Sequence, residues 1–217
     1  MFKTKSLNNI DNIMLSNDNK MKTKLKMIRV IEEHPEGVHL RELSRLLKTG
    51  LPNVLRYTKI LEKEKVIKKQ KDANLIKLKL KKNPRTIAYL TQINTEKFLA
   101  LPQRIQTAIS DFLDELDNKP LIALVFGSYA KGNYTKKSDI DILLVFQRVE
   151  NESQIENTAK RISMRTNTKI SPIYLNYKNF EKNFLNKKHD FSREIRQNVI
   201  LLSGAELYYR LLWRFLE

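Results

Sequence analysis

The sequence predicts an α+β protein made of two small units joined by helices. In the first half, apolar residues recur at helical spacing and then alternate with lysines, which indicates helices followed by a β-hairpin. In the second half, two apolar strands flank a Gly-Ser turn and an acidic pair, which indicates a small mixed sheet flanked by helices. The expected parts are a disordered tail at residues 1–19, a helical and hairpin unit at 20–83, a helical connector at 84–118 and the sheet unit at 119–217.

Composition limits the classes of protein and site that this chain can form. With 217 residues, of which 41% are hydrophobic, the chain can bury two cores of modest size. It has no cysteine, which excludes disulfides and cysteine zinc sites, and its three histidines are too scattered to indicate a metal cluster. No stretch has the pattern of a membrane span or an apolar signal core, so we expect a cytoplasmic protein with no membrane partner.

Positive charge is concentrated in the first half of the chain, within a formal net charge of +17. Residues 1–84 hold 21 Lys and Arg against 9 Asp and Glu, a net of +12, and the rest holds 20 against 15, a net of +5. This asymmetry indicates a polyanionic partner for the first half. A lysine-rich proteome or a hot habitat is the alternative explanation.

The first unit is expected to begin with two helices. The first should end before His34 and Pro35, since residues that precede proline disfavour the helical conformation. Its apolar positions are Met21, Leu25, Ile28 and Ile31. The segment HLRELSRLLK predicts a second helix that ends at Thr49 and Gly50. Its apolar face is expected to hold Leu40, Leu43, Leu46 and Leu47.

A third helix is predicted from Pro52, a favourable first-turn residue, to about Lys65. Its inner side is apolar and holds Val54, Tyr57, Thr58 and Leu61. Its outer side is basic and holds Asn53, Arg56, Lys59 and Lys63. A recognition helix is organised in this way, with the basic and amide-bearing side turned to the major groove and its phosphates.

A hairpin is predicted next, with arms at residues 66–71 and 75–81, and Lys77 and Lys79 alternate with apolar residues in its second arm. The order of three helices and a hairpin resembles the winged helix-turn-helix domain of many archaeal and bacterial regulators. The resemblance implies double-stranded DNA as a partner, regulation of transcription and a homodimer on paired half-sites. The DNA-binding residues would be Asn53, Arg56, Lys59, Lys63, Lys77 and Lys79. A module used only for dimerisation or protein contacts is the alternative.

Helices at 86–93 and 95–116 are predicted to connect the two units, and the second has an apolar stripe typical of core packing. In the sheet unit we expect further helices at 153–164, 178–185, 192–200 and 205–216.

The segment Leu121–Phe146, LIALVFGSYAKGNYTKKSDIDILLVF, is the most informative part of the chain. Gly127 allows the backbone to approach a triphosphate closely, and the Ser128 hydroxyl and the amides that follow can donate to phosphate oxygens. Asp139 and Asp141 are two residues apart on a strand, so they project from the same side. Two carboxylates this close repel each other, and a hard cation such as Mg²⁺ relieves the repulsion while it binds substrate phosphates.

This segment resembles the minimal nucleotidyltransferases of the DNA polymerase beta superfamily, whose pattern is a strand, Gly-Ser, a short helix and Asp-x-Asp on the next strand. The matching residues are Gly127, Ser128, Ala130, Gly132, Ser138, Asp139 and Asp141. The resemblance implies transfer of a nucleoside monophosphate from an NTP, ATP foremost, to a hydroxyl acceptor. It implies that Asp139 and Asp141 are catalytic and hold Mg²⁺. The nucleotide would be bound by Gly127, Ser128, Lys131 and Ser138. A solvated basic loop is an equal interpretation of Lys131, and a tight turn beside an acidic edge is the alternative for the whole segment.

The sequence departs from the superfamily pattern at a third carboxylate. Superfamily enzymes place this group on a later strand, where it completes the metal site and can take the proton from the attacking hydroxyl. Here the candidate strand is KISPIYL, Lys169–Leu175, and no Asp or Glu occurs between Glu156 and Glu181. Ser171 or a neighbour is expected in that place, and a serine supplies no negative charge. Glu181 and Asp190 are conceivable substitutes, or ordinary surface charges.

Two functions follow from these features. The first is a DNA-binding nucleotidyltransferase that acts as an antitoxin or regulator, with a partner protein such as a toxin, a nucleic-acid end or a metabolite as the acceptor. The second is a winged-helix transcriptional regulator whose nucleotidyltransferase domain binds nucleotide but is weak or inactive, because the third carboxylate is missing. A pure protein-interaction module is a third possibility.

Overall fold

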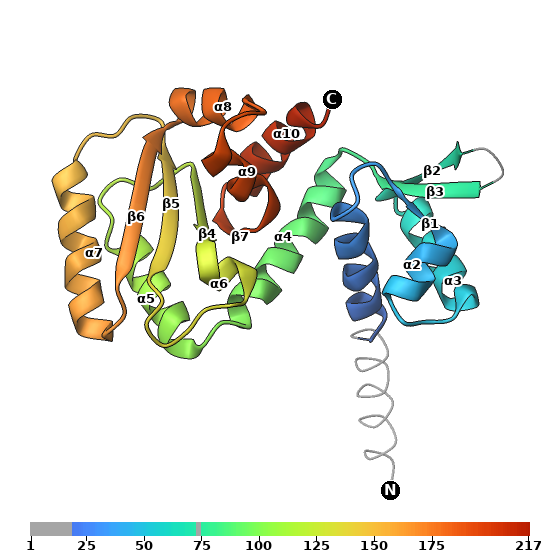
Figure 1. Cartoon of the computed structure of the whole chain (residues 1–217), viewed down its shortest axis with the longest axis horizontal. Helices are drawn as coiled ribbons and strands as arrows, with labels where there is room; N and C mark the ends of the chain where they lie inside the picture. The colour runs from blue at the N-terminus through green and yellow to red at the C-terminus, as the bar shows by residue number, and fades with distance from the viewer. Residues whose placement is uncertain (1–18, 73–74) are drawn as a thin grey trace, which may run out of the picture. The chain divides into compact units, whose positions relative to one another are not determined.

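The computed structural model describes residues 19–72 and 75–217 and divides into two compact units (Figure 1). Unit 1 is Met1–Leu90 and unit 2 is Thr91–Glu217. The tail predicted at residues 1–19 lies outside the described residues, except for Asn19, which is the first described residue of a helix.

Unit 1 combines helices with a small antiparallel sheet. Residues 19–32 are helical. The elements that follow are β1 (Val38–His39), α2 (Leu40–Leu46), α3 (Leu51–Lys63), β2 (Ile67–Asp72) and β3 (Leu75–Leu80). The strand order is β1-β3-β2, and both pairings are antiparallel. The predicted hairpin is therefore confirmed in its two arms, while the tip of its turn, residues 73 and 74, lies outside the described residues.

The core of unit 1 follows the apolar pattern of its helices. The inner side predicted for α3 is confirmed, because all four of its residues are buried: Val54, Tyr57, Thr58 and Leu61. In α2 the predicted apolar face is wrong at Leu46, whose side chain is 45% exposed, whereas Leu43 is fully buried. The reason is local, since α2 ends at Leu46 and the chain turns away through Lys48, which has a φ of 49°.

A polar cluster ties together three helical segments of unit 1. The Lys24 ammonium lies 2.5 Å from Glu64 Oε1, and the Tyr89 hydroxyl donates to Glu64 Oε2 at 2.7 Å. Lys24 belongs to the first helix, Glu64 caps α3, and Tyr89 belongs to α4 (Pro84–Leu99). The cluster therefore fixes the C-terminal end of α3, which leads into the hairpin.

The two connecting helices meet at a different place from the one predicted. The break expected near residue 94 is wrong, since α4 continues to Leu99 and α5 (Gln103–Asp114) begins after Pro102. The Gln106 side-chain amide donates to the carbonyl oxygens of Leu99 and Leu101 at 3.0 and 2.8 Å. Pro102 is the N-cap of α5. The fixed backbone angle of proline and the hydrogen bonds of the Gln106 amide therefore determine where the chain turns between α4 and α5.

Unit 2 is built on a four-stranded mixed sheet, which confirms the predicted small mixed sheet and adds a strand, Ile200–Ser203, that the sequence analysis did not expect. Its elements after α5 are β4 (Ile122–Phe126), α6 (Gly127–Lys131), β5 (Ile140–Phe146), α7 (Glu152–Thr166), β6 (Ile170–Asn176), α8 (Tyr177–Leu185), α9 (Asp190–Gln197), β7 (Ile200–Ser203) and α10 (Ala205–Phe215). The strand order is β6-β5-β4-β7. The β5 and β6 strands are parallel, and the other two pairings are antiparallel.

The helix predicted at residues 192–200 is wrong at its end. It stops at Gln197, and Ile200 begins β7, which pairs antiparallel with β4. The backbone amide of Leu201 donates to the Asn94 side chain at 2.9 Å. Pairing with a distant strand thus overrides the local helical pattern.

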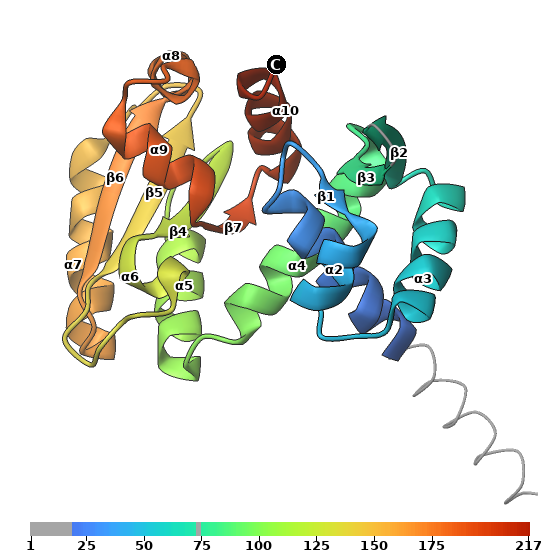
Figure 2. The same ribbon diagram turned by 45° about the vertical axis from the view of Figure 1, so that its right-hand side comes forward.

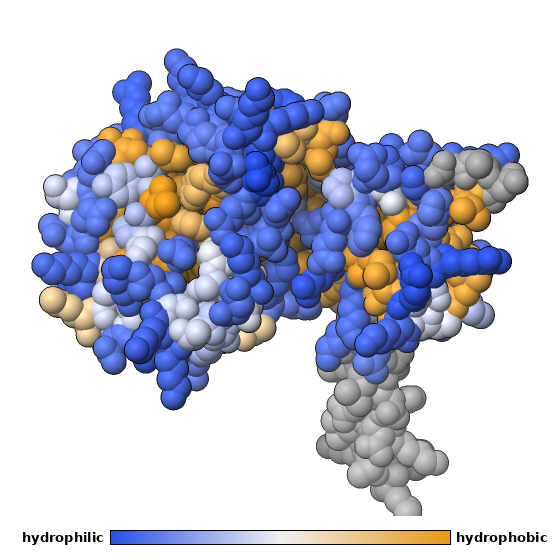
Figure 3. Space-filling model, in the orientation of Figure 1, coloured by the Kyte–Doolittle hydropathy of each residue, from blue (hydrophilic) through white to orange (hydrophobic). Residues whose placement is uncertain are grey.

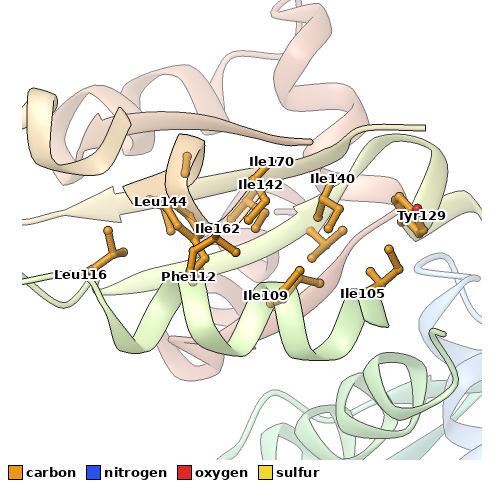
Figure 4. Packing of buried hydrophobic residues seen from close by; sticks show 14 of the residues in the cluster. Ile105, Ile109, Phe112, Leu116, Tyr129, Ile140, Ile142, Leu144, Ile162 and Ile170 are labelled. Atoms are coloured by element: carbon orange, nitrogen blue, oxygen red, sulfur yellow. The ribbon is translucent and has the colours of Figure 1, made fainter. Parts of the chain in front are cut away.

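The two faces of the sheet carry different layers. On one face α5 and α7 pack against alternate residues of β4, β5 and β6 (Figure 4). The residues labelled in this cluster are Ile105, Ile109, Phe112, Leu116, Tyr129, Ile140, Ile142, Leu144, Ile162 and Ile170. On the other face α8 contacts β5 and β6, and α10 contacts β4. Figure 2 shows α9 in front of the sheet on this second side. Because strand residues alternate, the side chains of Asp139 and Asp141 point to that second side.

Hydrophilic residues cover most of the visible surface, with apolar residues exposed in patches (Figure 3). Within residues 19–72 and 75–217, the helices are all too short or too polar to span a bilayer.

Candidate active site

The junction of β4 and α6 touches the acidic pair directly. Gly127 follows β4 with a φ of +69°, and its neighbour Phe126 pairs with Asp141 across the sheet. A Cβ atom on Gly127 would lie 2.2 Å from Asp141 Oδ2, closer than any real carbon atom could approach. Glycine is therefore required both by the backbone conformation and by the carboxylate that packs on it.

The second carboxylate is already partnered. Asp139 Oδ2 lies 2.5 Å from the Lys169 ammonium and accepts a hydrogen bond from the Ser171 hydroxyl at 3.2 Å. The Ile140 amide donates to the Lys169 carbonyl oxygen at 2.8 Å, so the strand ladder holds Lys169 beside the acidic pair. The first residues of β6 thus bring a cation and a hydroxyl to the site.

Strand register places Ser171, the residue expected in place of a third carboxylate, beside the acidic pair. In the parallel pairing of β5 and β6, Asp141 is opposite Ser171. The sequence of β6, Ile170–Asn176, contains no acidic residue. The two substitutes considered from the sequence lie in other pairs, since Glu181 binds Arg214 at 2.8 Å and Asp190, 87% exposed, binds an arginine of its own helix.

A third acidic side chain, Glu194, reaches the site from α9, and the sequence analysis missed it. Its carboxylate lies 2.6 Å from the ammonium of Lys131, the last residue of α6. Helix α9 also contacts β4, because the Phe191 ring packs edge-on against Phe126 with 5.4 Å between the ring centres. Nothing in the local pattern around Glu194 distinguishes it from a surface charge, so only the tertiary packing identifies it.

The electrostatics of the site centre on Asp141. Burial raises the pKa of Asp141, and the negative charges of Asp139 and Glu194 raise it further, against the opposing charges of Lys169 and Lys131. The Asp139 carboxylate, as hydrogen-bond partner and as charge, raises the pKa of Lys169. Three carboxylates and two ammonium groups leave one uncompensated negative charge, which favours a bound cation.

The residues present fit a divalent cation that is shared with a nucleotide. Two carboxylates on one side of β5 and phosphate oxygens are the ligands that Mg²⁺ prefers. In the described part of the chain, residues 19–72 and 75–217, no three or more acidic, histidine or cysteine side chains form a cluster that could hold a metal alone. A cation held by Asp139 and Asp141 would take its other ligands from a bound nucleotide or from water.

The other predicted nucleotide-binding residues surround the same turn. Ser128 is half-buried at the second position of α6, and Lys131 at its end is engaged with Glu194. The Ser138 hydroxyl accepts a hydrogen bond from the Thr135 amide at 2.9 Å, which closes the loop before Asp139. Ser138 thus shapes the loop that leads into the acidic pair.

The predicted DNA-binding residues of α3 lie on its outer side. Arg56, Lys59 and Lys63 are exposed, and their spacing of three and four places them on one helix face. Asn53 is half-buried, accepts a hydrogen bond from Arg56 at 2.9 Å and donates to Thr49 Oγ1 at 3.1 Å. One basic face with an oriented amide is available to a ligand.

The two predicted lysines of the hairpin lie on β3, on the side opposite the buried Leu78. Lys79 stands directly across the ladder from Lys68, and its ammonium lies 3.8 Å from Glu36. Like charges in directly opposed positions destabilise a hairpin, so the pairing favours an anionic partner.

Unit 1 also has an apolar pocket of about 560 Å³ beside α2, α3 and β3. Its apolar lining is Leu40, Leu51, Leu55, Leu75 and Ile76. Leu75 and Ile76 are 53% and 42% exposed, which is typical of a surface that contacts a protein. The pocket keeps the protein-contact alternative for unit 1 open.

Replacing Gly127 tests the close approach to Asp141. Gly127→Ala and Gly132→Ala both place alanine at a positive φ, which costs about 1–2 kcal/mol. A Cβ on Gly132 meets no atom within 4 Å, so only Gly127→Ala adds a clash, worth about a further 1–3 kcal/mol. The single tryptophan, Trp213, lies in unit 2, so urea unfolding followed by its fluorescence measures both variants. Equal losses would contradict the geometry.

Asp141→Asn is expected to stabilise the metal-free protein at neutral pH. The folded-state pKa of Asp141 is raised above the usual value of an aspartate, about 3.9. Its contribution to stability is therefore fully present below that value and is lost as pH rises through the folded pKa. The variant should gain more stability over the wild type at pH 7 than at pH 3, in urea unfolding with a chelator. A gain of the same size at both pH values would contradict the raised pKa.

Comparisons with known proteins agree with the chemistry of this site. Residues 107–202 match the family model described as Polymerase beta, Nucleotidyltransferase. A protein of Methanocaldococcus jannaschii named "putative protein adenylyltransferase" is 29% identical over 94 residues, which are 42% of this chain and 87% of that protein. A crystal structure of a "putative nucleotidyltransferase" from Sulfolobus solfataricus is 21% identical and covers 41% of this chain and 78% of that one, with a TM-score of 0.26, too low to carry an argument. The family match and the relative support a nucleotidyltransferase domain of the polymerase beta type within unit 2.

Proposed function

We propose that unit 2 transfers a nucleoside monophosphate from ATP to a hydroxyl group of a partner protein. The observation that carries this proposal is the contact between Gly127 and Asp141, with Asp139 near enough for its charge to raise the pKa of Asp141. A backbone turn suited to phosphates thus lies directly against one carboxylate of a pair suited to a cation.

Each residue of the site has a separate task in this proposal. Gly127 lets the triphosphate lie against the backbone, and the Ser128 hydroxyl donates to a phosphate oxygen. Lys131 neutralises phosphate charge at the end of α6. Asp139 and Asp141 would hold Mg²⁺, which would supply positive charge against the phosphates and the leaving pyrophosphate. The acceptor oxygen attacks the α-phosphorus, and the bond to the bridging oxygen of pyrophosphate breaks.

A protein acceptor is favoured by the relative named for protein adenylylation. The alignment with that relative covers 94 residues, which are 42% of this chain. Unit 1 would then select where the enzyme acts. A toxin-like partner protein is one acceptor of this kind.

A second candidate function is nucleotide binding without transfer. Lys169 holds Asp139 in an ion pair, and Ser171 takes the place opposite Asp141. A cation must compete with Lys169 for that carboxylate, which favours weak metal binding and slow turnover. Unit 2 would then act as a nucleotide sensor of a regulator.

We propose that unit 1 is a winged helix-turn-helix domain that binds double-stranded DNA. Its order of helices and hairpin, the exposed basic face of α3 and the opposed lysines on β2 and β3 support this proposal. The basic face of α3 would enter the major groove, and the hairpin lysines would contact phosphates.

Labelled ATP distinguishes the two candidate functions of unit 2. Full-length protein, Mg²⁺ and α-labelled ATP are incubated with cell lysate, and label on protease-sensitive bands is measured. We expect wild type to transfer label and Asp141→Asn to transfer none. The variant lacks one of the two carboxylates that would hold the Mg²⁺ bound to ATP. The matched control is Asp190→Asn, an exposed position in unit 2 that should keep full labelling.

Absence of label with wild type, together with a rise in melting temperature on addition of Mg²⁺ and ATP, would favour the nucleotide-binding candidate. Absence of both would contradict each candidate. Labelling by Asp141→Asn at the wild-type rate would show that the acidic pair is not the site.

Binding of duplex DNA by unit 1 should depend on the basic face of α3. Arg56→Ala and Lys59→Ala should each weaken binding and lower the slope of affinity against salt by about one phosphate contact. Fluorescence anisotropy over a salt series measures both. Arg29→Ala removes an exposed arginine that is paired with Glu33 on the first helix, and it should leave the slope unchanged. Equal slopes in all variants would place the DNA contact elsewhere.

A further inference from the structure

We propose that Glu194 on α9 is the general base of the transfer reaction, in place of a carboxylate on β6. This inference rests on the proposed function of unit 2. It assigns a catalytic role to a residue that lies about fifty positions beyond the acidic pair and outside the Asp-x-Asp pattern.

The position of Glu194 is fixed by contacts on both sides of it along α9. Before it, the Phe191 ring packs against Phe126, the residue that pairs with Asp141. After it, the Ile195 carbonyl oxygen accepts a hydrogen bond from the buried Tyr208 hydroxyl at 2.7 Å. The turn that carries Glu194 therefore stands over the end of β4 where the nucleotide turn begins.

The strand that was expected to supply the base cannot do so. Its residues beside the acidic pair are Lys169 and Ser171, an ammonium group and a hydroxyl. Neither takes a proton from an alcohol at neutral pH as a carboxylate does. Among the acidic residues beyond β6, Glu181 is bound to Arg214, whereas Glu194 is bound to a lysine of the nucleotide turn itself.

The partner of Glu194 links its release to the nucleotide. Lys131 ends the short helix that starts at Gly127, so its ammonium is within the turn that would hold the triphosphate. A triphosphate carries more negative charge than one carboxylate, and it draws Lys131 away from Glu194. The Glu194 side chain, 31% exposed, is then free to accept a proton from an incoming hydroxyl.

The proposed step is a proton transfer coupled to displacement of pyrophosphate. The acceptor O–H bond breaks, its proton goes to a Glu194 carboxylate oxygen, and the acceptor oxygen forms a bond to the α-phosphorus. The bond from that phosphorus to the bridging oxygen breaks, and pyrophosphate leaves with its electron pair. The acceptor hydroxyl and ATP are the only co-reactants.

The test compares Glu194→Gln with wild type and with Glu206→Gln, which removes an exposed glutamate paired with Arg210 on α10. Glu194→Gln should lower the rate of label transfer by about 10²–10⁴-fold, the usual range for a lost general base. It should keep the rise in melting temperature caused by Mg²⁺ and ATP. Glu206→Gln should match wild type in both measurements.

A second readout needs neither metal nor nucleotide. Nitrogen-15 NMR of the lysine ammonium groups in the metal-free protein follows Lys131, whose ammonium lies 2.6 Å from the Glu194 carboxylate. In Glu194→Gln the Lys131 resonance should move, and in Glu206→Gln it should not. An unchanged Lys131 resonance in Glu194→Gln would show that Glu194 does not reach the nucleotide turn, and it would overturn the inference.

Label transfer by wild type and by Glu194→Gln distinguishes the general-base assignment from the proposed function. If wild type transfers label and Glu194→Gln transfers it at the same rate, Glu194 is not the base while the function stands. If Glu194→Gln loses the ATP-dependent rise in melting temperature, its role is in binding and the general-base assignment is wrong. If wild type transfers no label to any protein, the proposed function fails first and the base assignment fails with it.

Discussion

The close approach of Gly127 to the Asp141 carboxylate is the constraint on which the rest of unit 2 depends. The approach requires β4 to end beside Asp141, and the register of β4 and β5 sets that position. It also requires a residue without a side chain at a positive φ. The large apolar layer of α5 and α7 on the opposite face holds these strands in register, while α8 and α10 pack on the face that carries Asp141.

The carboxylates of the site are largely paired with lysines of the protein. Asp139 is neutralised by Lys169 and Glu194 by Lys131, while Asp141 keeps a raised pKa. Without ligands, lysines of the protein thus neutralise two of the three carboxylates of the site. Nucleotide and cation would exchange these ion pairs for phosphate and metal contacts, and the lysines would move from carboxylates to phosphates. Because of the cost of that exchange, we expect nucleotide and cation to bind together.

Much of this arrangement could be predicted from the sequence, and the reasons differ by residue. Alternating apolar residues fix the face of Asp141, and the resemblance to the superfamily pattern led us to expect Ser171 or a neighbour in the place of a third carboxylate. The inner side of α3 followed from helical spacing. Strand β7 could not be predicted, because four apolar residues after a helix acquire their pairing only from β4. Glu194 was missed for the same reason, since packing of Phe191 rather than sequence spacing brings it to the site.

The most direct test of the account is a crystal structure of the full chain soaked with Mn²⁺ and a non-hydrolysable ATP analogue. The account predicts an anomalous peak in contact with Asp139 and Asp141, with the triphosphate against Gly127 and Ser128, and Lys131 turned from Glu194 to a phosphate. A nucleotide bound away from the turn at Gly127, or a cation that contacts neither aspartate, would contradict the account.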